Sequence, residues 1–175
     1  VTSTTSNDTY KVGDAINITV NFSEAVSLSS SGSMTVTLET GSTDRTVSIT
    51  SISSATSASG TYTVQAGDVS SDLTVKSIAV SGTVSDASDQ AMVDFSIGAN
   101  LASSSAIVVD GVAPTVASVK STSTNTTYGT GASINITVNF SESVSLSSGG
   151  SMTVTLETGS TDRTVSITSI SSATS

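Results

Sequence analysis

The stretch "SMTVTLETGSTDRTVSI", residues Ser33–Ile49, decides the fold. Apolar residues take every second position on both sides of a polar centre, E-T-G-S-T-D. Alternation with period two is typical of a strand that buries one face, and polar residues around a glycine favour a turn. The stretch therefore predicts a β-hairpin that joins Met34–Leu38 to Val47–Ile49.

The same stretch occurs again, letter for letter, at Ser151–Ile167. The match extends upstream, so that Tyr10 aligns with Tyr128 at an offset of 118 residues without a gap. Only six of the 48 aligned positions differ. A period of 118 residues suits one domain and is too long for the unit of a solenoid. The sequence therefore predicts domains in tandem, the second represented by its first half.

Further alternating segments surround the hairpin, and none shows helical spacing. A shift of phase between Val75 and Ile78 predicts a bulge or a bend. Glycine-containing segments, among them S-A-S-G ending at Gly60 and A-G-D ending at Asp68, predict turns. The expected strands are Ile16–Phe22, Met34–Leu38, Val47–Ile49, Tyr62–Val64, Leu73–Val75, Ile78–Val80, Val93–Ile97 and Ile107–Val109. This series predicts an all-β fold, an antiparallel Ig-like β-sandwich repeated in tandem.

The single proline, Pro114, divides the chain. We expect a first repeat at residues 1–110, a linker at 111–114 and a truncated second repeat at 115–175. Four strands with one bare face leave apolar surface and a sheet edge exposed, so we expect the second copy not to fold alone. The expectation is that the array continues or that a neighbouring chain adds the missing strands.

Composition excludes several classes of function. The net charge is −9 with five Lys and Arg, which argues against nucleic-acid binding. The absence of Cys and His removes the usual ligands of zinc, iron–sulfur and haem sites. It also leaves few catalytic combinations, so we expect no enzyme activity. No segment is long and apolar enough for a transmembrane helix.

Several segments together resemble the tandem Ig-like, cadherin-like repeats of giant bacterial surface adhesins and biofilm matrix proteins. They are "YKVGDAINITVNFSEAV" from Tyr10, "YTVQAGDVSSDL" from Tyr62, "VSDASDQAM" from Val84 and "AIVVDGVAP" from Ala106. The D-x-x-A-P linker and the F-S-E strand end carry most of the likeness. The resemblance implies an extracellular location, at the cell surface or in a secreted matrix. It also implies calcium between domains, although the family's D-A-x-G-N loop reads D-A-S-D-Q here.

Acidic side chains provide the candidate calcium ligands. Counting strands places Asp68 and Asp72 at the pole that faces the linker, beside Asp110. The second strand of the next repeat brings Glu142 back to the same linker. Calcium binds six to eight oxygens at flexible spacing, so these four carboxylates are the predicted junction site. If the first repeat had one strand more or fewer, Asp86 and Asp89 would lie at this pole in place of Asp68 and Asp72. The alternative is that all are solvated aspartates of ordinary turns.

The expected function is that of a structural spacer that extends or stiffens a surface fibre, with neighbouring repeats of the same protein as its partners. The alternative is a self-assembling subunit of an extracellular filament or sheath, joined by strand addition or lateral packing between chains. A sugar-binding module is a weaker possibility, because the chain has no Trp and three Tyr.

Overall fold

The computed structural model describes all residues, 1–175, and they divide into two compact units. Unit 1 comprises Val1–Val112 and unit 2 comprises Ala113–Ser175. The boundary between them falls inside the predicted linker. The fold is all-β, as predicted, apart from one short 3-10 helix at Leu101–Ser103. No helix is of the length and hydropathy that crossing a bilayer requires.

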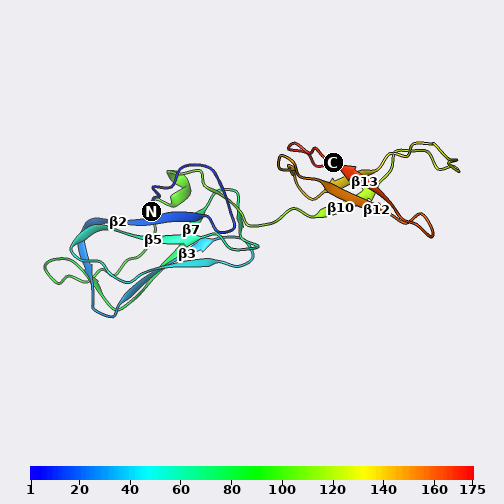
Figure 1. Cartoon of the computed structure of the whole chain (residues 1–175). Coiled ribbons are helices and arrows are strands. Elements are labelled where there is room, and N and C mark those ends of the chain that lie inside the picture. Colours follow the sequence, from blue (N-terminus) through cyan, green and yellow to red (C-terminus); the bar gives the residue numbers. More distant parts are fainter. The chain divides into compact units, whose positions relative to one another are not determined.

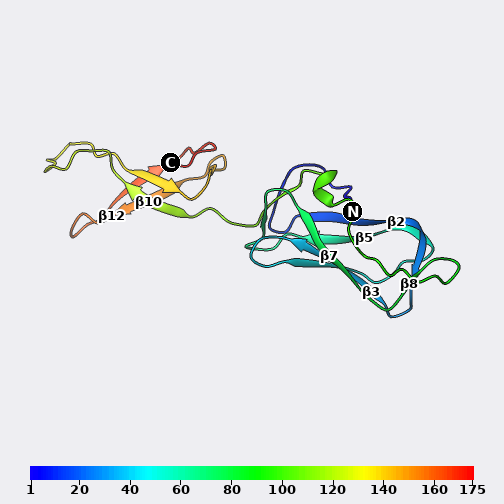
Figure 2. The same cartoon turned by 180° about the vertical axis from the view of Figure 1, so that it is seen from behind.

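Three small sheets build unit 1, with strand orders β5-β2-β8, β4-β3-β7 and β1-β9-β6. In both views β2 and β5 lie on one side of the unit and β3 on the other (Figures 1 and 2). The strands are β1 (Thr9–Lys11), β2 (Ala15–Leu28), β3 (Ser33–Glu39), β4 (Arg45–Ile49), β5 (Ala55–Thr63), β6 (Val69–Ser70), β7 (Thr74–Ser81), β8 (Val84–Ser85) and β9 (Val108–Asp110).

The hairpin predicted from Ser33–Ile49 is confirmed as β3 and β4, paired antiparallel with Val36 opposite Val47. The predicted bulge is also confirmed. The register of β7 against β3 shifts between Ser77 and Val75, so Lys76 has no partner in the ladder. The Lys76 amino group instead contacts the carboxylates of Asp44, at 2.8 Å, and Glu39, at 3.3 Å.

The apolar positions of the alternating strands form one core. The alternation predicts a core of Ile16, Ile18, Val20, Phe22, Met34, Val36, Leu38, Tyr62, Val64, Leu73, Val75, Ile78 and Val80. All of these are buried except Phe22, Ile78 and Val80, which are partly buried and pack against the core. Phe22 lies in the stretch where the register between β2 and β5 shifts, so its ring is not fully covered. The buried apolar residues of unit 1 are Ile16, Ile18, Val20, Val26, Met34, Val36, Leu38, Val47, Ile49, Ile52, Ala58, Tyr62, Val64, Leu73, Val75, Val84, Leu101, Ile107 and Val109.

Two local predictions are wrong. Residues 93–97 form no strand, and the side chain of Val93 is 91% exposed. No neighbouring strand pairs with this segment, so its alternation has no ladder to join. The S-A-S-G segment is not a turn but the middle of β5, opposite β2. A Cβ on Gly60 would collide with the Val47 side chain, so glycine serves here for close approach to β4.

The prediction of a purely antiparallel arrangement needs one correction, because β1 and β9 pair in parallel, with Tyr10 opposite Val109. The chain also begins alongside β2, where Thr2 pairs antiparallel with Thr19. Its first and last strands therefore run in the same direction. The chain begins alongside the first half of β2, and it leaves next to the turn that follows β5, whose last residue Thr63 lies opposite Ala15 at the start of β2.

Unit 2 repeats the pairings of unit 1 at the same offset of 118 residues. Its strands are β10 (Val116–Lys120), β11 (Thr137–Phe140), β12 (Met152–Leu156) and β13 (Arg163–Ile167). Val154 lies opposite Val165, as Val36 lies opposite Val47. The inward side chains of β12 and β13 are only half-buried, whereas their counterparts in β3 and β4 are buried.

Candidate functional site

The carboxylate of Asp68 organises the end of unit 1 from which the chain leaves. Asp68 follows the tight turn between β5 and β6, in which Gly67 has a φ of 87°. The residue is 1% exposed. An ionised carboxylate is costly to bury without partners, so its contacts decide what this site is.

Three donors satisfy the two oxygens of Asp68. The Arg45 Nε donates to Oδ1 at 2.8 Å, and the Tyr62 hydroxyl donates to Oδ2 at 2.7 Å. The backbone N–H of Gln65 donates to Oδ2 at 2.9 Å and closes the turn. Arg45 comes from β4 and Tyr62 from β5, so this one carboxylate joins the two sheets to the turn.

These contacts determine the ionisation of the site. Burial by itself raises the pKa of Asp68, but the hydrogen bonds from Tyr62, Gln65 and Arg45 outweigh it and hold that pKa below its ordinary value. Burial raises the pKa of the Tyr62 hydroxyl, and its hydrogen bond to Asp68 raises it further. At neutral pH the site therefore holds an aspartate anion and a neutral tyrosine.

The same turn, at Gly67–Asp68, also holds the segment through which the chain leaves unit 1. The Gly111 N–H donates to the Asp68 carbonyl at 2.7 Å, and the Gly67 N–H donates to the Gly111 carbonyl at 2.9 Å. A Cβ on Gly111 would lie 2.8 Å from the Asp68 carbonyl oxygen and 2.9 Å from the Asp68 nitrogen. Because those are backbone atoms of a fixed turn, only glycine fits. We call Arg45, Tyr62, Asp68 and Gly111 the linker anchor.

The predicted calcium ligands have different surroundings. The turn of Asp68 does lie beside the start of the linker, as the strand count predicted, since Val69 pairs with Asp110. Both oxygens of Asp68, however, are already bonded within unit 1. Asp72 Oδ1 and Glu142 Oε1 are buried atoms without a protein hydrogen-bond partner. The Asp110 Oδ1 accepts a hydrogen bond of 3.3 Å from the Val112 N–H.

The alternative calcium ligands, Asp86 and Asp89, lie far from the linker. Asp86 and Asp89 belong to the loop after β8, which pairs with the far end of β2. The Asp86 Oδ1 accepts the N–H groups of Ser88, at 2.8 Å, and Gln90, at 2.9 Å. Within either unit, no three acidic side chains gather into a group that fits a metal ion. As placed, the donors of unit 1 do not form a calcium site on their own, and calcium at the junction stays a prediction.

The second half of the same junction motif is formed within unit 2. The Thr115 N–H donates to the Ser141 hydroxyl oxygen at 2.9 Å, and the Ser141 N–H donates to the Thr115 carbonyl at 2.9 Å. The F-S-E strand end therefore returns to the residue that follows Pro114, as the sequence predicted. Glu142 is the next residue along the chain.

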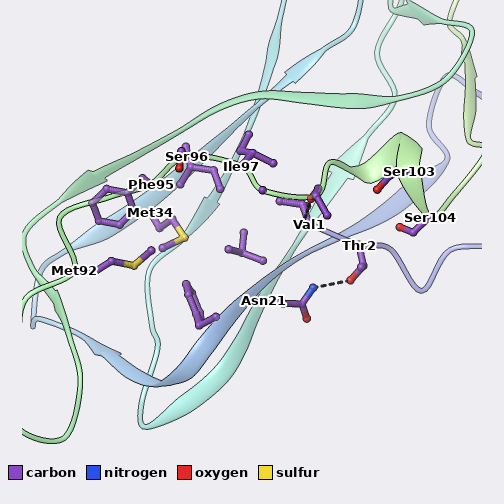
Figure 3. Close-up of a pocket in the computed structure, with 15 residues that line it drawn as sticks. Val1, Thr2, Asn21, Met34, Met92, Phe95, Ser96, Ile97, Ser103 and Ser104 are labelled. Carbon is purple, nitrogen blue, oxygen red and sulfur yellow. Dashed lines mark hydrogen bonds between the residues drawn. The ribbon is translucent and has the colours of Figure 1, made fainter.

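A pocket of about 350 Å³ opens on the other side of unit 1, and Figure 3 shows its lining. Its apolar lining includes Met34, Met92, Phe95 and Ile97. The polar side chains at its rim are amides and hydroxyls, such as Asn21 and Thr2, which are joined by a hydrogen bond of 3.0 Å. No titratable side chain lines the pocket.

Sequence reasoning had missed the linker anchor, although Tyr62 was correctly assigned to the core. The signal that could have revealed it is the scarcity of cations, since a chain with five Lys and Arg has few partners for a buried aspartate. No family model, no curated protein and no solved structure matches the chain.

Proposed function

We propose that the chain is a structural spacer of an extracellular bacterial adhesin or matrix protein, with each full repeat an Ig-like sandwich. The observation that carries this proposal is the repeated structure. Unit 2 pairs β12 with β13 in the same register that joins β3 to β4 in unit 1, at an offset of 118 residues. An array of such units gains length with each copy.

The linker anchor supports the same function. A spacer transmits tension only if its connections are fixed, and Gly111 is held by two backbone hydrogen bonds to the turn at Gly67–Asp68. The buried charge cluster joins that turn to β4 and β5. Force applied to the linker is therefore transmitted to both sheets.

The near-identity of the two copies also supports a spacer. A binding module needs a distinct surface, whereas a spacer needs only length, and 42 of the 48 aligned positions are identical. Low charge and the scarcity of aromatic residues leave few features that recognise a ligand. Neighbouring repeats of the same protein are the partners that this function requires.

Immunogold electron microscopy of the cells that make the protein tests the proposal. An antibody against unit 1 is expected to label thin, flexible threads outside the cell. Label confined to the cell interior contradicts the spacer function. Label along ordered helical fibres favours the second candidate, a self-assembling subunit of an extracellular filament.

A further inference from the structure

The peptide bond between Asp110 and Gly111 is the one Asp–Gly bond in the sequence, and no Asn–Gly bond occurs. An aspartyl carboxyl can react with the backbone nitrogen of the next residue, because both groups belong to one molecule and are only a few bonds apart. Glycine favours this reaction, since it has no Cβ to shield its nitrogen or to restrict its backbone. The peptide bond most prone to the reaction therefore lies where the chain leaves unit 1.

The structure restrains both reacting groups. Asp110 is the last residue of β9 and pairs with a strand on each side, β1 and β6, so the ladder opposes the rotation about its Cα–C bond that ring closure requires. The Gly111 N–H, which the reaction must deprotonate, donates to the Asp68 carbonyl at 2.7 Å. The Asp110 Oδ1 accepts from the Val112 N–H at 3.3 Å, so the carboxyl already faces the peptides that follow it.

Opening of the linker anchor removes these restraints, and the ends of a folded unit open locally more readily than its core. The Gly111 nitrogen then forms a bond to Cγ of Asp110. The nitrogen loses its proton, and one carboxyl oxygen leaves as water with a second proton from solvent. Water afterwards opens the five-membered ring at either carbonyl. One product is the original aspartate, and the other is isoaspartate, whose main chain contains one additional methylene.

We propose that Asp110–Gly111 is a site of aspartate isomerisation that is protected while the linker anchor is closed, and that isomerisation prevents the anchor from closing again. Gly111 is fixed by two backbone hydrogen bonds to the turn at Gly67–Asp68, while Asp110 is fixed in the β9 ladder. An additional main-chain atom between the two residues is incompatible with both sets of contacts. A brief opening of the anchor is thereby converted into a lasting covalent change. The inference goes beyond the spacer function and does not depend on it.

Prolonged incubation of the full chain in warm neutral buffer tests the protection. A synthetic peptide of residues 106–114 in the same buffer gives the rate without the anchor. Isoaspartate at position 110 is measured by liquid chromatography and electron-transfer fragmentation, which distinguish the two isomers of equal mass. The proposal expects the reaction to be at least about tenfold slower in the full chain than in the peptide, which corresponds to about 1.4 kcal/mol of protection.

Gly67→Ala is the variant that favours opening of the anchor. Gly67 has a φ of 87°, where alanine is strained, yet a Cβ there meets nothing within 4 Å. Isoaspartate is therefore expected to form about fivefold faster at Asp110 in this variant. Gly131→Ala is the matched control, because Gly131 has a φ of 89° and equally open surroundings but lies in unit 2. This control is expected to leave the rate at Asp110 unchanged.

Hydrogen exchange tests whether the anchor closes after the reaction. Chains isomerised at position 110 are separated from unmodified chains, and exchange of the Gly67 amide is measured in both. This amide donates to the Gly111 carbonyl at 2.9 Å in the closed anchor. It is expected to exchange faster in the isomerised chains, while the amides of β3 keep their protection.

Three results would overturn the proposal. Equal rates in the full chain and in the peptide would show that the anchor gives no protection. Equal rates in Gly67→Ala and Gly131→Ala would show that the reaction does not depend on the turn. An unchanged exchange rate of the Gly67 amide in isomerised chains would show that the anchor closes despite the modification. None of these results bears on the spacer function, which the position of the label on cells decides separately.

Discussion

The Tyr62 hydroxyl donates a hydrogen bond of 2.7 Å to the carboxylate of Asp68, a residue only six positions further along the chain. The intervening segment turns sharply at Gly67, which brings the Asp68 carboxylate back to the Tyr62 hydroxyl. Arg45 completes the cluster from another strand. The structure at the end where the chain leaves unit 1 therefore depends on the Asp68 carboxylate. This dependence can be tested in several ways.

Replacement of Asp68 by Asn should destabilise unit 1 by about 3 kcal/mol, because it leaves Arg45 without its counter-charge in a largely buried site. Arg45 is partly exposed, so we place the expected cost at the lower end of the range for broken buried pairs. Urea denaturation followed by circular dichroism measures it. Asp86→Asn, in a solvent-exposed loop, is the control, and an equal effect of both variants would contradict the role of the anchor.

Acid should weaken unit 1 through the same residue. The pKa of Asp68 lies below its ordinary value in the folded state, so its contribution to stability is present above the unfolded value of about 3.9. That contribution is lost as the pH falls through the folded pKa. The free energy of unfolding is therefore expected to drop below about pH 4 more steeply in the parent chain than in Asp68→Asn. If the free energy of unfolding fell equally steeply with pH in both chains, Asp68 would not be responsible for the loss of stability in acid.

Substitution of Gly111 by Ala should detach the linker from the turn. The new methyl group meets backbone atoms of Asp68 that cannot move without opening the turn. Hydrogen exchange is expected to speed up at the amides of Gly67 and residue 111, while the amides of β3 keep their protection. Gly98→Ala, where a Cβ meets nothing within 4 Å, is the control. An unchanged exchange rate of the Gly67 amide would contradict the role of Gly111 in the linker anchor.

The two copies of one strand allow a matched comparison of burial. Met34 is fully buried, and Met152 at the equivalent position is half-buried. Met34→Ala should cost about 2–5 kcal/mol, as in other cores, and Met152→Ala clearly less. Calorimetry of both variants measures the difference. Equal losses would mean that the inner face of unit 2 is covered in solution.

Calcium at the junction remains to be tested directly. If Asp72, Asp110 and Glu142 bind it, calcium should raise the melting temperature of the chain above that in chelator, and magnesium should not. Asp72→Asn should reduce the shift, and Asp86→Asn should leave it unchanged. Identical melting with calcium and with chelator would remove this prediction.

The sequence predicted the hairpin, the bulge and the main core because alternation reports directly which face of a strand is buried. It failed at Val93–Ile97, since a period of two says nothing about whether a neighbouring strand exists. It misread Gly60, because glycine serves close approach as well as turns. The turn of Asp68 was placed correctly, but its chemistry was not predicted, since the partner Arg45 lies 23 positions away on another strand.

The identical sequences of β3 and β12 have a consequence for folding during translation. Translation at roughly 5–20 residues per second makes β12 roughly 2–8 s after unit 1 is complete, and small β domains fold in milliseconds to seconds. On the ribosome, β7 therefore meets β3 before β12 has been made. A chain refolded from denaturant has no such order, so β7 can pair with either β3 or β12. Newly synthesised chains should thus reach the native state in a single phase, and denatured chains should show an additional slow phase in which mispaired strands separate.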